Sequence, residues 1–349
     1  MKMQLLKEIL KTFNEKEIDY DVYIIANAHN IKKETERWDY AHSTLDEFFS
    51  RQEFAEISSA IYNVFGFVKV FYSELEFMDY VIKNKIDRNN LIVFNFSRDG
   101  IREGKKSLIP SFCDLFEIKY TGSNAFVISL LRNKFVYSTF LSHLNIPVPN
   151  SYLFNIKKGF INSEPDCGMK IIKCVNESAS IGMTNNNIIT VKNDYSYVDK
   201  IKDCMKLMST ENVLIQDYIE GSECEVVVFN RGDTYFSLEP VMLKIKNNSI
   251  ITTDISNSYD YDFCLLSDYY DSDICTNISA CAENAARLLN IKTYARFDFR
   301  IDPNNNFFLI DIAGTPYTIH HSSISFIFKH YKLQYEDIFR IIAQLTKEN

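Results

Sequence analysis

The chain has 349 residues, of which 46% are hydrophobic and 24% are charged, and its formal net charge at pH 7 is −8. This composition is typical of a soluble globular protein with two or three domains, and no apolar run approaches the roughly 20 residues that span a bilayer. The negative charge, without any block of Lys and Arg, argues against general nucleic-acid binding and favours a small-molecule partner.

Residues 1–16 have leucines and isoleucines at helical spacing, which predicts an amphipathic helix and not a signal peptide. The eight cysteines are scattered and show no Cys-x-x-Cys spacing. We therefore expect reduced thiols and a cytoplasmic protein that has no contact with membranes.

The first hundred residues alternate between two kinds of segment. Strands are predicted at residues 21–26, 67–72 and 91–96, and a helix at residues 53–65. Such alternation predicts a parallel sheet flanked by helices. Ligands bind at the carboxyl ends of parallel strands, so the polar loop at residues 27–51 is well placed to touch a substrate. Its candidate contacts are Trp38, Tyr40 and His42, for which surface packing is the alternative role.

Two helices are expected next, at residues 105–116 and 124–144, with a strand-like segment between them. Pro147 and Pro149 follow the second helix and end it. We expect the first domain to end near Gly122. Lys134 interrupts the apolar spacing of the second helix, and a lysine that extends its amine to solvent is one explanation.

The middle of the chain predicts a strand at residues 169–174 that carries Lys173 into a loop of small residues. Small residues let backbone N–H groups approach a phosphate closely, although the Walker sequence is absent. A helix at 194–208 and two strands joined through Glu220 and Gly221 follow. The acidic, tyrosine-rich segment 254–273 is expected to be a solvated loop, or else a lid over the site.

Residues 294–322 predict a hairpin with an acid in the apolar part of each strand. Asp298 lies between Phe297 and Phe299, and Asp311 lies between Ile310 and Ile312. The turn at residues 303–306 would bring these carboxylates together, where Mg²⁺ could offset their repulsion. Arg296 shares the face of Asp298, and an arginine with a metal suits a phosphoryl group. The alternative is a buried ion pair between Arg296 and an aspartate, without catalysis.

Taken in order, these pieces resemble the ATP-grasp superfamily and, within it, the D-alanine–D-alanine ligase-like branch. The resemblance covers roughly residues 90–330. It depends on Tyr120–Ser123, the Arg-Asn-Lys sequence that ends at Lys134, the strand carrying Lys173, the following loop, and the His-Ser pair at 321–322. The implied fold is an N-terminal parallel-sheet α/β domain, residues 1–122, followed by two ATP-grasp lobes, residues 123–213 and 214–349, with the nucleotide between the lobes.

The resemblance also implies roles for individual residues. Those expected to contact ATP are Lys134, Lys173, Glu177, Ser180, Gln216, Asp217, Tyr218, Ile219 and Glu223. Asp298 and Asp311 match metal-binding positions for Mg²⁺, or Mn²⁺. Arg296 and Lys173 match catalytic positions. Tyr317, His321 and Ser322 match the site of the second substrate.

The activity implied is a carboxylate–amine ligase that forms an amide through an acyl phosphate, with small-molecule carboxylate and amine substrates, amino acids or peptides among them. Such an enzyme could also be a homodimer. This sequence has Ala313 where the family usually has a metal-binding Asn, and Ala179 where a serine would touch the first substrate. Two alternatives therefore remain open: a true D-alanine–D-alanine ligase with variant contacts, and a degenerate protein that binds nucleotide without turnover.

Overall fold

The computed structural model of the protein describes residues 2–15, 20–29, 47–246 and 250–349. The loop residues singled out above, Trp38, Tyr40 and His42, lie outside these ranges. Within the described ranges, no helix combines the length and the apolar character needed to cross a membrane.

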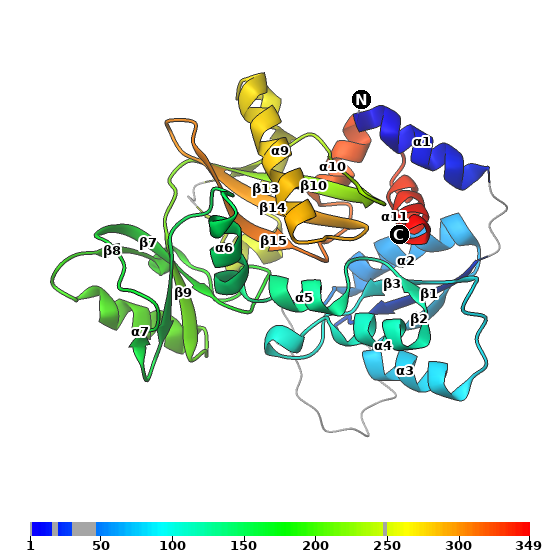
Figure 1. Cartoon of the computed structure of the whole chain (residues 1–349), viewed down its shortest axis with the longest axis horizontal. Coiled ribbons are helices and arrows are strands. Elements are labelled where there is room, and N and C mark those ends of the chain that lie inside the picture. The colour runs from blue at the N-terminus through cyan, green and yellow to red at the C-terminus, as the bar shows by residue number, and fades with distance from the viewer. Residues whose placement is uncertain (1, 16–19, 30–46, 247–249) are drawn as a thin grey trace.

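The predicted N-terminal parallel sheet is confirmed, with strand order β2-β1-β3-β4. Its strands are β1 (Asp21–Ala26), β2 (Lys69–Phe71), β3 (Leu91–Phe96) and β4 (Lys119–Tyr120). The helices of this region are α1 (Lys2–Asn14), α2 (Arg51–Phe65), α3 (Glu74–Lys83) and α4 (Leu108–Phe116). Apolar side chains of α2 pack against one face of the sheet and those of α3 and α4 against the other, so β1 and β3 are almost wholly buried (Figure 1).

The helix predicted at residues 105–116 begins later, at Leu108. Lys106 has a left-handed backbone (φ 69°), which a continuous α-helix cannot contain. Lys105 and Lys106 therefore belong to the loop after β3 and not to α4.

The single helix predicted at residues 124–144 is wrong. The chain forms α5 (Ala125–Leu131) and α6 (Lys134–His143), with a break at Arg132 and Asn133. The side chain of Asn133 caps α6 by accepting a hydrogen bond from the Val136 N–H (3.1 Å), and the Lys134 N–H donates to the Val175 carbonyl (3.1 Å). The apolar spacing continues across the break, so only these cap and tertiary contacts reveal it.

The small lobe is a five-stranded antiparallel sheet of order β6-β5-β9-β7-β8, with one helix packed against it. It lies at one end of the molecule (Figure 1). Its elements are β5 (Ser151–Asn155), β6 (Gly159–Phe160), β7 (Gly168–Cys174), β8 (Ile188–Val191), α7 (Tyr197–Leu207) and β9 (Asn212–Asp217).

The large lobe is an antiparallel sheet of order β13-β12-β10-β14-β15, with β11 paired to β10. Its strands are β10 (Ser222–Arg231), β11 (Thr234–Ser237), β12 (Val241–Ile245), β13 (Tyr261–Leu265), β14 (Tyr294–Ile301) and β15 (Phe307–Ala313). The helices are α8 (Thr253–Ser258), α9 (Ser272–Leu288), α10 (Ser323–His330) and α11 (Glu336–Glu348). α11 packs against α1 and α2, so the two ends of the chain meet beside the N-terminal sheet (Figure 1).

The segment 254–273 is not the solvated loop expected. It contains most of α8, the whole of β13 and the start of α9, and β13 pairs with β12 over five residue pairs. Tyr259 and Tyr261 of this segment are partly buried, and their rings supply apolar surface for packing. The many acidic residues around them in the sequence had instead suggested a solvated loop.

The two lobes are joined by the short connection between β9 and β10. Gly221 has φ 134°, and a Cβ there would come within 1.9 Å of the Ile301 carbonyl oxygen. Only glycine fits a backbone in this conformation and this close to β14. The connection is therefore held tightly against the end of the hairpin predicted from the sequence. The domain boundaries at residues 122 and 213 stay predictions.

Candidate active site

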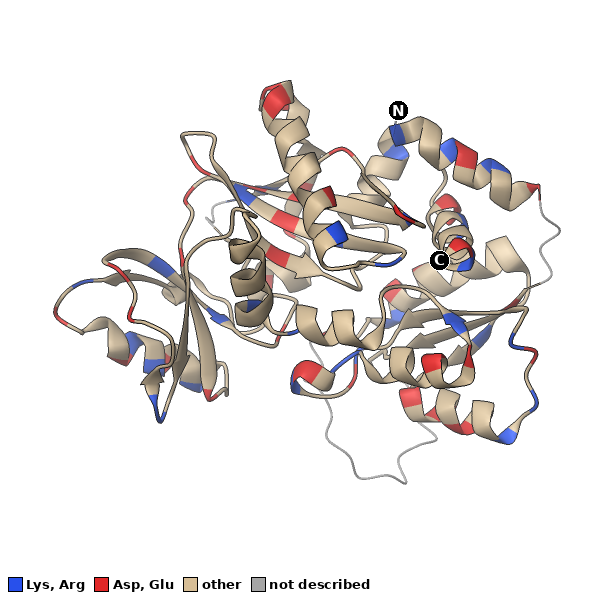
Figure 2. Cartoon of the chain, in the orientation of Figure 1, with Lys and Arg blue, Asp and Glu red and all other residues tan. Residues whose placement is uncertain are grey.

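A cavity of about 500 Å³ lies where the two lobes meet the carboxyl ends of the N-terminal strands. Every site residue implied by the family resemblance lines it: Lys134, Lys173, Glu177, Ser180, Gln216, Asp217, Tyr218, Ile219, Glu223, Arg296, Asp298, Asp311, Tyr317, His321 and Ser322. These residues span almost 190 positions of the chain, so their convergence is a property of the tertiary structure. Figure 2 shows that the strands of the large lobe carry both acidic and basic residues.

The predicted hairpin forms, and Asp298 on β14 is directly opposite Asp311 on β15. Arg296 holds Asp298 with a two-pronged contact, Nε to Oδ1 and NH2 to Oδ2, each 2.8 Å. On the other side of β14, Glu225 of β10 is opposite Asp298 and reaches Arg296 at 3.2 Å. Three carboxylates therefore form a row across neighbouring strands. The ion pair considered as an alternative is present in the structure.

Burial and charge act in opposite directions on the two aspartates. Burial raises the pKa of Asp298 above its usual range, and Arg296 offsets this only in part. Burial also acts on Asp311, but Lys134 and Lys173 outweigh it and hold the pKa of that carboxyl below its usual range. Burial raises the pKa of Glu225 to about 7. Asp311 is thus the carboxylate held most firmly in its charged form.

Lys134 binds the hairpin directly. As the first residue of α6, it brings its Nζ to 2.5 Å from Oδ1 and 2.6 Å from Oδ2 of Asp311. The hydroxyl of Tyr137, one turn later, donates to Oδ1 of Asp311 at 2.8 Å. The explanation of Lys134 as a surface lysine is wrong, because its side chain is 10% exposed and faces the cavity.

The residues predicted to contact the nucleotide on this side lie on β7, on β9 and the connection that follows it, and at the start of β10. Lys173 Nζ donates to the side-chain oxygen of Gln216 at 3.1 Å. Asp217 forms an ion pair with Lys170, and Glu223 forms one with Arg300 at 3.2 Å. Burial lowers the pKa of Lys173 to about 8. On this wall of the cavity, the acids Asp217 and Glu223 are thus each paired with a basic side chain.

The loop predicted to close over phosphates begins after β7 and runs past Ser180. Ala179 and Ser180 both have left-handed backbones, with φ 55° and 53°. The carbonyl of Ser180 accepts a hydrogen bond from Thr253 Oγ1 at 2.6 Å, and Glu177 pairs with Lys105 at 3.0 Å. The loop is therefore attached to the large lobe at one end and to the N-terminal domain at the other.

The predicted second-substrate residues lie after β15. The hydroxyl of Tyr317 donates to the Glu47 carbonyl at 3.0 Å. His321 packs among the rings of Tyr259, Tyr261 and Phe263, with centroids 4.9 to 5.2 Å apart.

Ser322 caps α10, accepting a hydrogen bond from the Ser325 N–H at 3.3 Å and donating to the Ile319 carbonyl at 2.6 Å. Its contacts are accordingly those of a helix cap.

Asp298 and Asp311 suit a hard cation. In the parts of the chain that the structure describes, no three His, Cys, Asp or Glu side chains are grouped to hold a metal ion on their own. Mg²⁺ commonly takes only one or two carboxylates and completes its octahedron with water and substrate phosphates. Two facing aspartates fit such an ion when phosphate oxygens share it.

Several cavity residues were missed by reasoning from the sequence. Glu225 lies two positions after Glu223 on one strand, so the period of two could have found it. Arg98 and Lys106 follow β3, at the carboxyl end of a parallel strand, where the topology predicts ligand contacts. Glu47 does not line the cavity but pairs with Lys106, which does; it gave no signal, since it stands in a polar stretch without periodicity.

Comparison with known proteins supports the resemblance to D-alanine–D-alanine ligases that the sequence motifs indicated. The family model for the D-ala D-ala ligase C-terminus matches residues 168–344, which is more than half of the chain. The D-alanine–D-alanine ligase of Aquifex aeolicus is 21% identical over 221 residues, covering 62% of this chain and 69% of the relative. That of Cupriavidus taiwanensis is 22% identical over 251 residues, covering 70% and 73%.

Solved structures agree in fold. The D-alanine–D-alanine ligase from Bacillus anthracis complexed with ATP superposes with a TM-score of 0.69 at 12% identity, covering 94% of this chain and 97% of that one. The ligase from Coxiella burnetii gives a TM-score of 0.62 at 13% identity, covering 95% and 94%. The predicted ATP-grasp fold, with its N-terminal parallel sheet, is confirmed, and the chain belongs to the D-alanine–D-alanine ligase family of ATP-grasp ligases.

Proposed function

We propose that the protein is an ATP-dependent carboxylate–amine ligase that joins an acid to an amine through an acyl phosphate, with an amino acid or peptide on at least one side. The observation that carries the proposal is the meeting of Lys134, Lys173, Arg296, Asp298 and Asp311 at one cavity. Buried cations beside paired carboxylates are the groups that a polyphosphate with a divalent cation requires.

ATP would lie between the lobes. Its adenine would meet the segment from Gln216 to Ile219, and its ribose hydroxyls would meet Glu223. The two lysines, Lys134 and Lys173, would bind the phosphates under the loop that carries Glu177 and Ser180. Asp298 and Asp311 would hold Mg²⁺, which neutralises part of the phosphate charge when bound.

The reaction has two steps, and neither requires a nucleophile from the protein. A carboxylate oxygen of the first substrate attacks the γ-phosphorus, the bond to the β–γ bridging oxygen breaks, and ADP leaves. The amine of the second substrate then attacks the acyl carbon, phosphate leaves, and the nitrogen loses a proton. Arg296, whose guanidinium Asp298 and Glu225 fix in place, would stabilise the negative charge that develops on the transferred phosphoryl group.

Two narrower alternatives follow from particular residues. The family relationship favours D-alanine as both substrates, whereas Ala179 removes a side-chain hydroxyl from the loop that would meet the first one. Ala313 favours the alternative in which the protein binds nucleotide without turnover. The family usually has a metal-binding Asn at this position, and alanine has no side-chain oxygen that could bind a metal ion next to Asp311.

The assay that separates these possibilities is phosphate release from ATP with Mg²⁺ across a panel of amino acids and dipeptides. Release that depends on a pair of substrates supports a ligase, and release with D-alanine alone identifies the family's usual reaction. If nucleotide binds but no pair gives release, the proposal fails and the degenerate alternative stands.

A further inference from the structure

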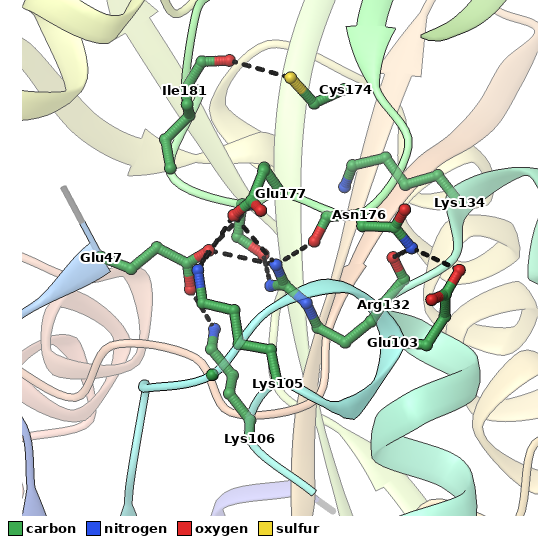
Figure 3. A network of polar contacts seen from close by, with 12 residues as sticks. Glu47, Glu103, Lys105, Lys106, Arg132, Lys134, Cys174, Asn176, Glu177 and Ile181 are labelled. Atoms are coloured by element: carbon green, nitrogen blue, oxygen red, sulfur yellow. Dashed lines mark hydrogen bonds and ion pairs between the residues drawn. The ribbon is translucent and has the colours of Figure 1, made fainter. Parts of the chain in front are cut away.

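Arg132, at the break between α5 and α6, holds three successive residues of the loop that follows β7. Its guanidinium contacts the Asn176 carbonyl, lies 3.3 Å from the Glu177 carboxylate and donates to the Ser178 hydroxyl at 2.7 Å (Figure 3). The Arg132 side chain is only 5% exposed. A planar guanidinium carries five N–H donors, so one arginine can make all three contacts at once. The first part of this loop, residues 175–183, is therefore fixed by one buried side chain.

Lys105 ties the same loop to the N-terminal domain. Its Nζ lies 3.0 Å from Glu177 and 2.8 Å from Glu47. Glu47 in turn accepts a hydrogen bond from the Ser178 N–H at 3.2 Å. The side chains of Lys105 and Glu47 are 0% and 1% exposed. Removing one partner from an ion pair this deeply buried leaves the other charge uncompensated, so movement of the loop away from Lys105 is opposed.

Asn176 adds a third attachment on this side. Its Nδ2 donates to Glu103 at 3.0 Å and to the Arg132 carbonyl at 3.1 Å (Figure 3). Glu103 belongs to the short 3₁₀ turn Arg102–Gly104, in the segment between β3 and α4. The loop is therefore bound to the N-terminal domain through its backbone, an amide side chain and a carboxylate.

The far end of the loop is bound to the large lobe. The Thr253 hydroxyl donates to the Ser180 carbonyl, as described above, and the Thr253 N–H donates to the Met183 carbonyl at 3.0 Å. Between the two attached ends, Ala179 and Ser180 have left-handed backbones. This conformation costs free energy in residues that have a Cβ, and it persists where surrounding contacts hold it. Detachment of either end would allow these residues to relax.

The charge of Glu177 argues against a direct part in binding phosphates. The loop is expected to cover the phosphates of ATP, and a carboxylate repels another anion. Its two ion pairs instead connect it to Lys105 and Arg132. Glu177 is thus better suited to holding the loop than to contacting the nucleotide.

The same segment also positions Lys134. The Lys134 N–H donates to the Val175 carbonyl at 3.1 Å, just before the residues that Arg132 holds. The beginning of the loop and the lysine expected to bind phosphate are therefore attached to one short break between helices. A change in the position of the loop would be transmitted to Lys134.

We propose that Glu177 is a positioning residue whose ion pairs with Lys105 and Arg132 form a latch that holds the loop 175–183 against the N-terminal domain. This role differs from the nucleotide contact that the family resemblance implies for Glu177. The proposal rests on the nucleotide site proposed above. While the latch is closed, water is kept from the acyl phosphate, and the latch must open before the nucleotide can leave.

Hydrogen exchange tests the latch without any turnover. The backbone amides of residues 177–182 are followed by mass spectrometry in the full chain without nucleotide. Glu177→Gln should raise their exchange rate about 10-fold, and Glu177→Asp, which keeps the charge, should have a smaller effect. Glu211→Gln is the matched control, because it removes an exposed ion pair with Lys157 in the small lobe. Equal exchange in Glu177→Gln and the unmodified protein overturns the proposal.

The dissociation rate of a fluorescent ADP analogue, measured by displacement with excess ADP, tests the effect on the nucleotide. Glu177→Gln should raise this rate about 10-fold, and Lys105→Met should reproduce the effect. The Lys105 side chain is fully buried and is not among the described residues that line the cavity, so it does not act by touching the nucleotide.

The double variant separates a latch from a direct contact. Because both substitutions break the same ion pair, Glu177→Gln with Lys105→Met should release the analogue no faster than the faster single variant. Additive effects, or an effect confined to Glu177→Gln, would instead assign Glu177 to the nucleotide and overturn the proposal. If Lys105→Met does not fold, hydrogen exchange in Glu177→Gln decides the matter.

Failure of the latch and failure of the proposed ligase function are distinguishable. Unchanged hydrogen exchange in Glu177→Gln removes the latch and leaves the ligase function untouched. Conversely, absence of phosphate release with every substrate pair removes the ligase function, whereas the exchange of residues 177–182 still reports whether Glu177 holds the loop.

Discussion

Lys134 and Asp311 are bound to each other, with the lysine nitrogen within 2.6 Å of both carboxylate oxygens. The first is expected to bind ATP phosphates and the second to bind Mg²⁺. Their ion pair gives each charge a partner within the protein. It also prevents Asp311 from being left as a buried, unpaired charge.

Lys134→Met should therefore have opposite effects on two ligands. Removing the ammonium frees Asp311, so the affinity for Mn²⁺ alone should rise several-fold, while the Kd for ATP with Mg²⁺ should rise about 10-fold because a phosphate contact is lost. Titration calorimetry measures both affinities, and the electron paramagnetic resonance signal of free Mn²⁺ measures the first independently. Lys157→Met is the control, and equal weakening of both ligands would contradict this account.

The contact between Arg296 and Asp298 leads to a second prediction. Arg296→Lys keeps the charge but cannot form two parallel hydrogen bonds to Asp298 while also reaching Glu225. We expect kcat to fall about 10²-fold with little change in the KM for ATP, since the lost stabilisation belongs to the transition state. Phosphate release under saturating ATP measures it.

A matched control exists for this substitution. Arg231 also forms a two-pronged contact, with Glu348, and neither residue lines the cavity. Arg231→Lys should leave kcat unchanged. If Arg296→Lys is equally silent, Arg296 is a structural partner of Asp298 and no more.

The third prediction concerns Ala313. It follows Asp311 by two positions on β15, so both face the cavity. Ala313→Asn would add an amide oxygen next to the carboxylate, and we expect half-maximal activity at a several-fold lower Mg²⁺ concentration. A metal-dependence curve identical to that of the unmodified protein would show that the alanine removes nothing the site uses.

The sequence predicts elements well where the pattern is local. Residues 22–26 form an apolar run after Asp21, and residues 91–96 are apolar except for Asn95; both segments are strands with the bounds predicted. The hairpin was also predicted, from a polar turn flanked by apolar runs. The register that places Asp298 opposite Asp311 was not, because it depends on a β-bulge between Asp298 and Phe299.

Long-range contacts were not accessible in this way. The break between α5 and α6 depends on the cap that the Asn133 side chain forms on α6 and on the hydrogen bond from the Lys134 N–H to the Val175 carbonyl. The spacing of apolar residues gives no information about either contact. Glu47 meets Glu177 on the same cations although 130 positions separate them. The resemblance to a family supplied the nucleotide lysines, whereas the contacts of Glu47 with Lys105 and Lys106 follow only from the folded chain.

The last prediction is a pH dependence of ATP binding, and it follows from Lys173. Burial lowers the pKa of this lysine to about 8, with Asp311 and Glu223 acting to raise it and Lys134 and Arg300 acting to lower it. Below that pH the ammonium is charged and attracts phosphate. Above it the free protein must take up a proton before the contact forms. The Kd for ATP should therefore rise as the pH goes from 7.5 to 9.5, approaching ~10-fold per pH unit at the upper end.

Calorimetry in two buffers of different ionisation enthalpy would measure the proton taken up on binding. Lys173→Arg keeps its charge throughout this range and should flatten the dependence, even if its geometry weakens binding overall. If the unmodified protein and Lys173→Arg show the same slope, the titrating group is elsewhere. Since the nucleotide's own phosphates are ionised at these pH values, a slope that disappears only with Lys173 assigns the proton to that side chain.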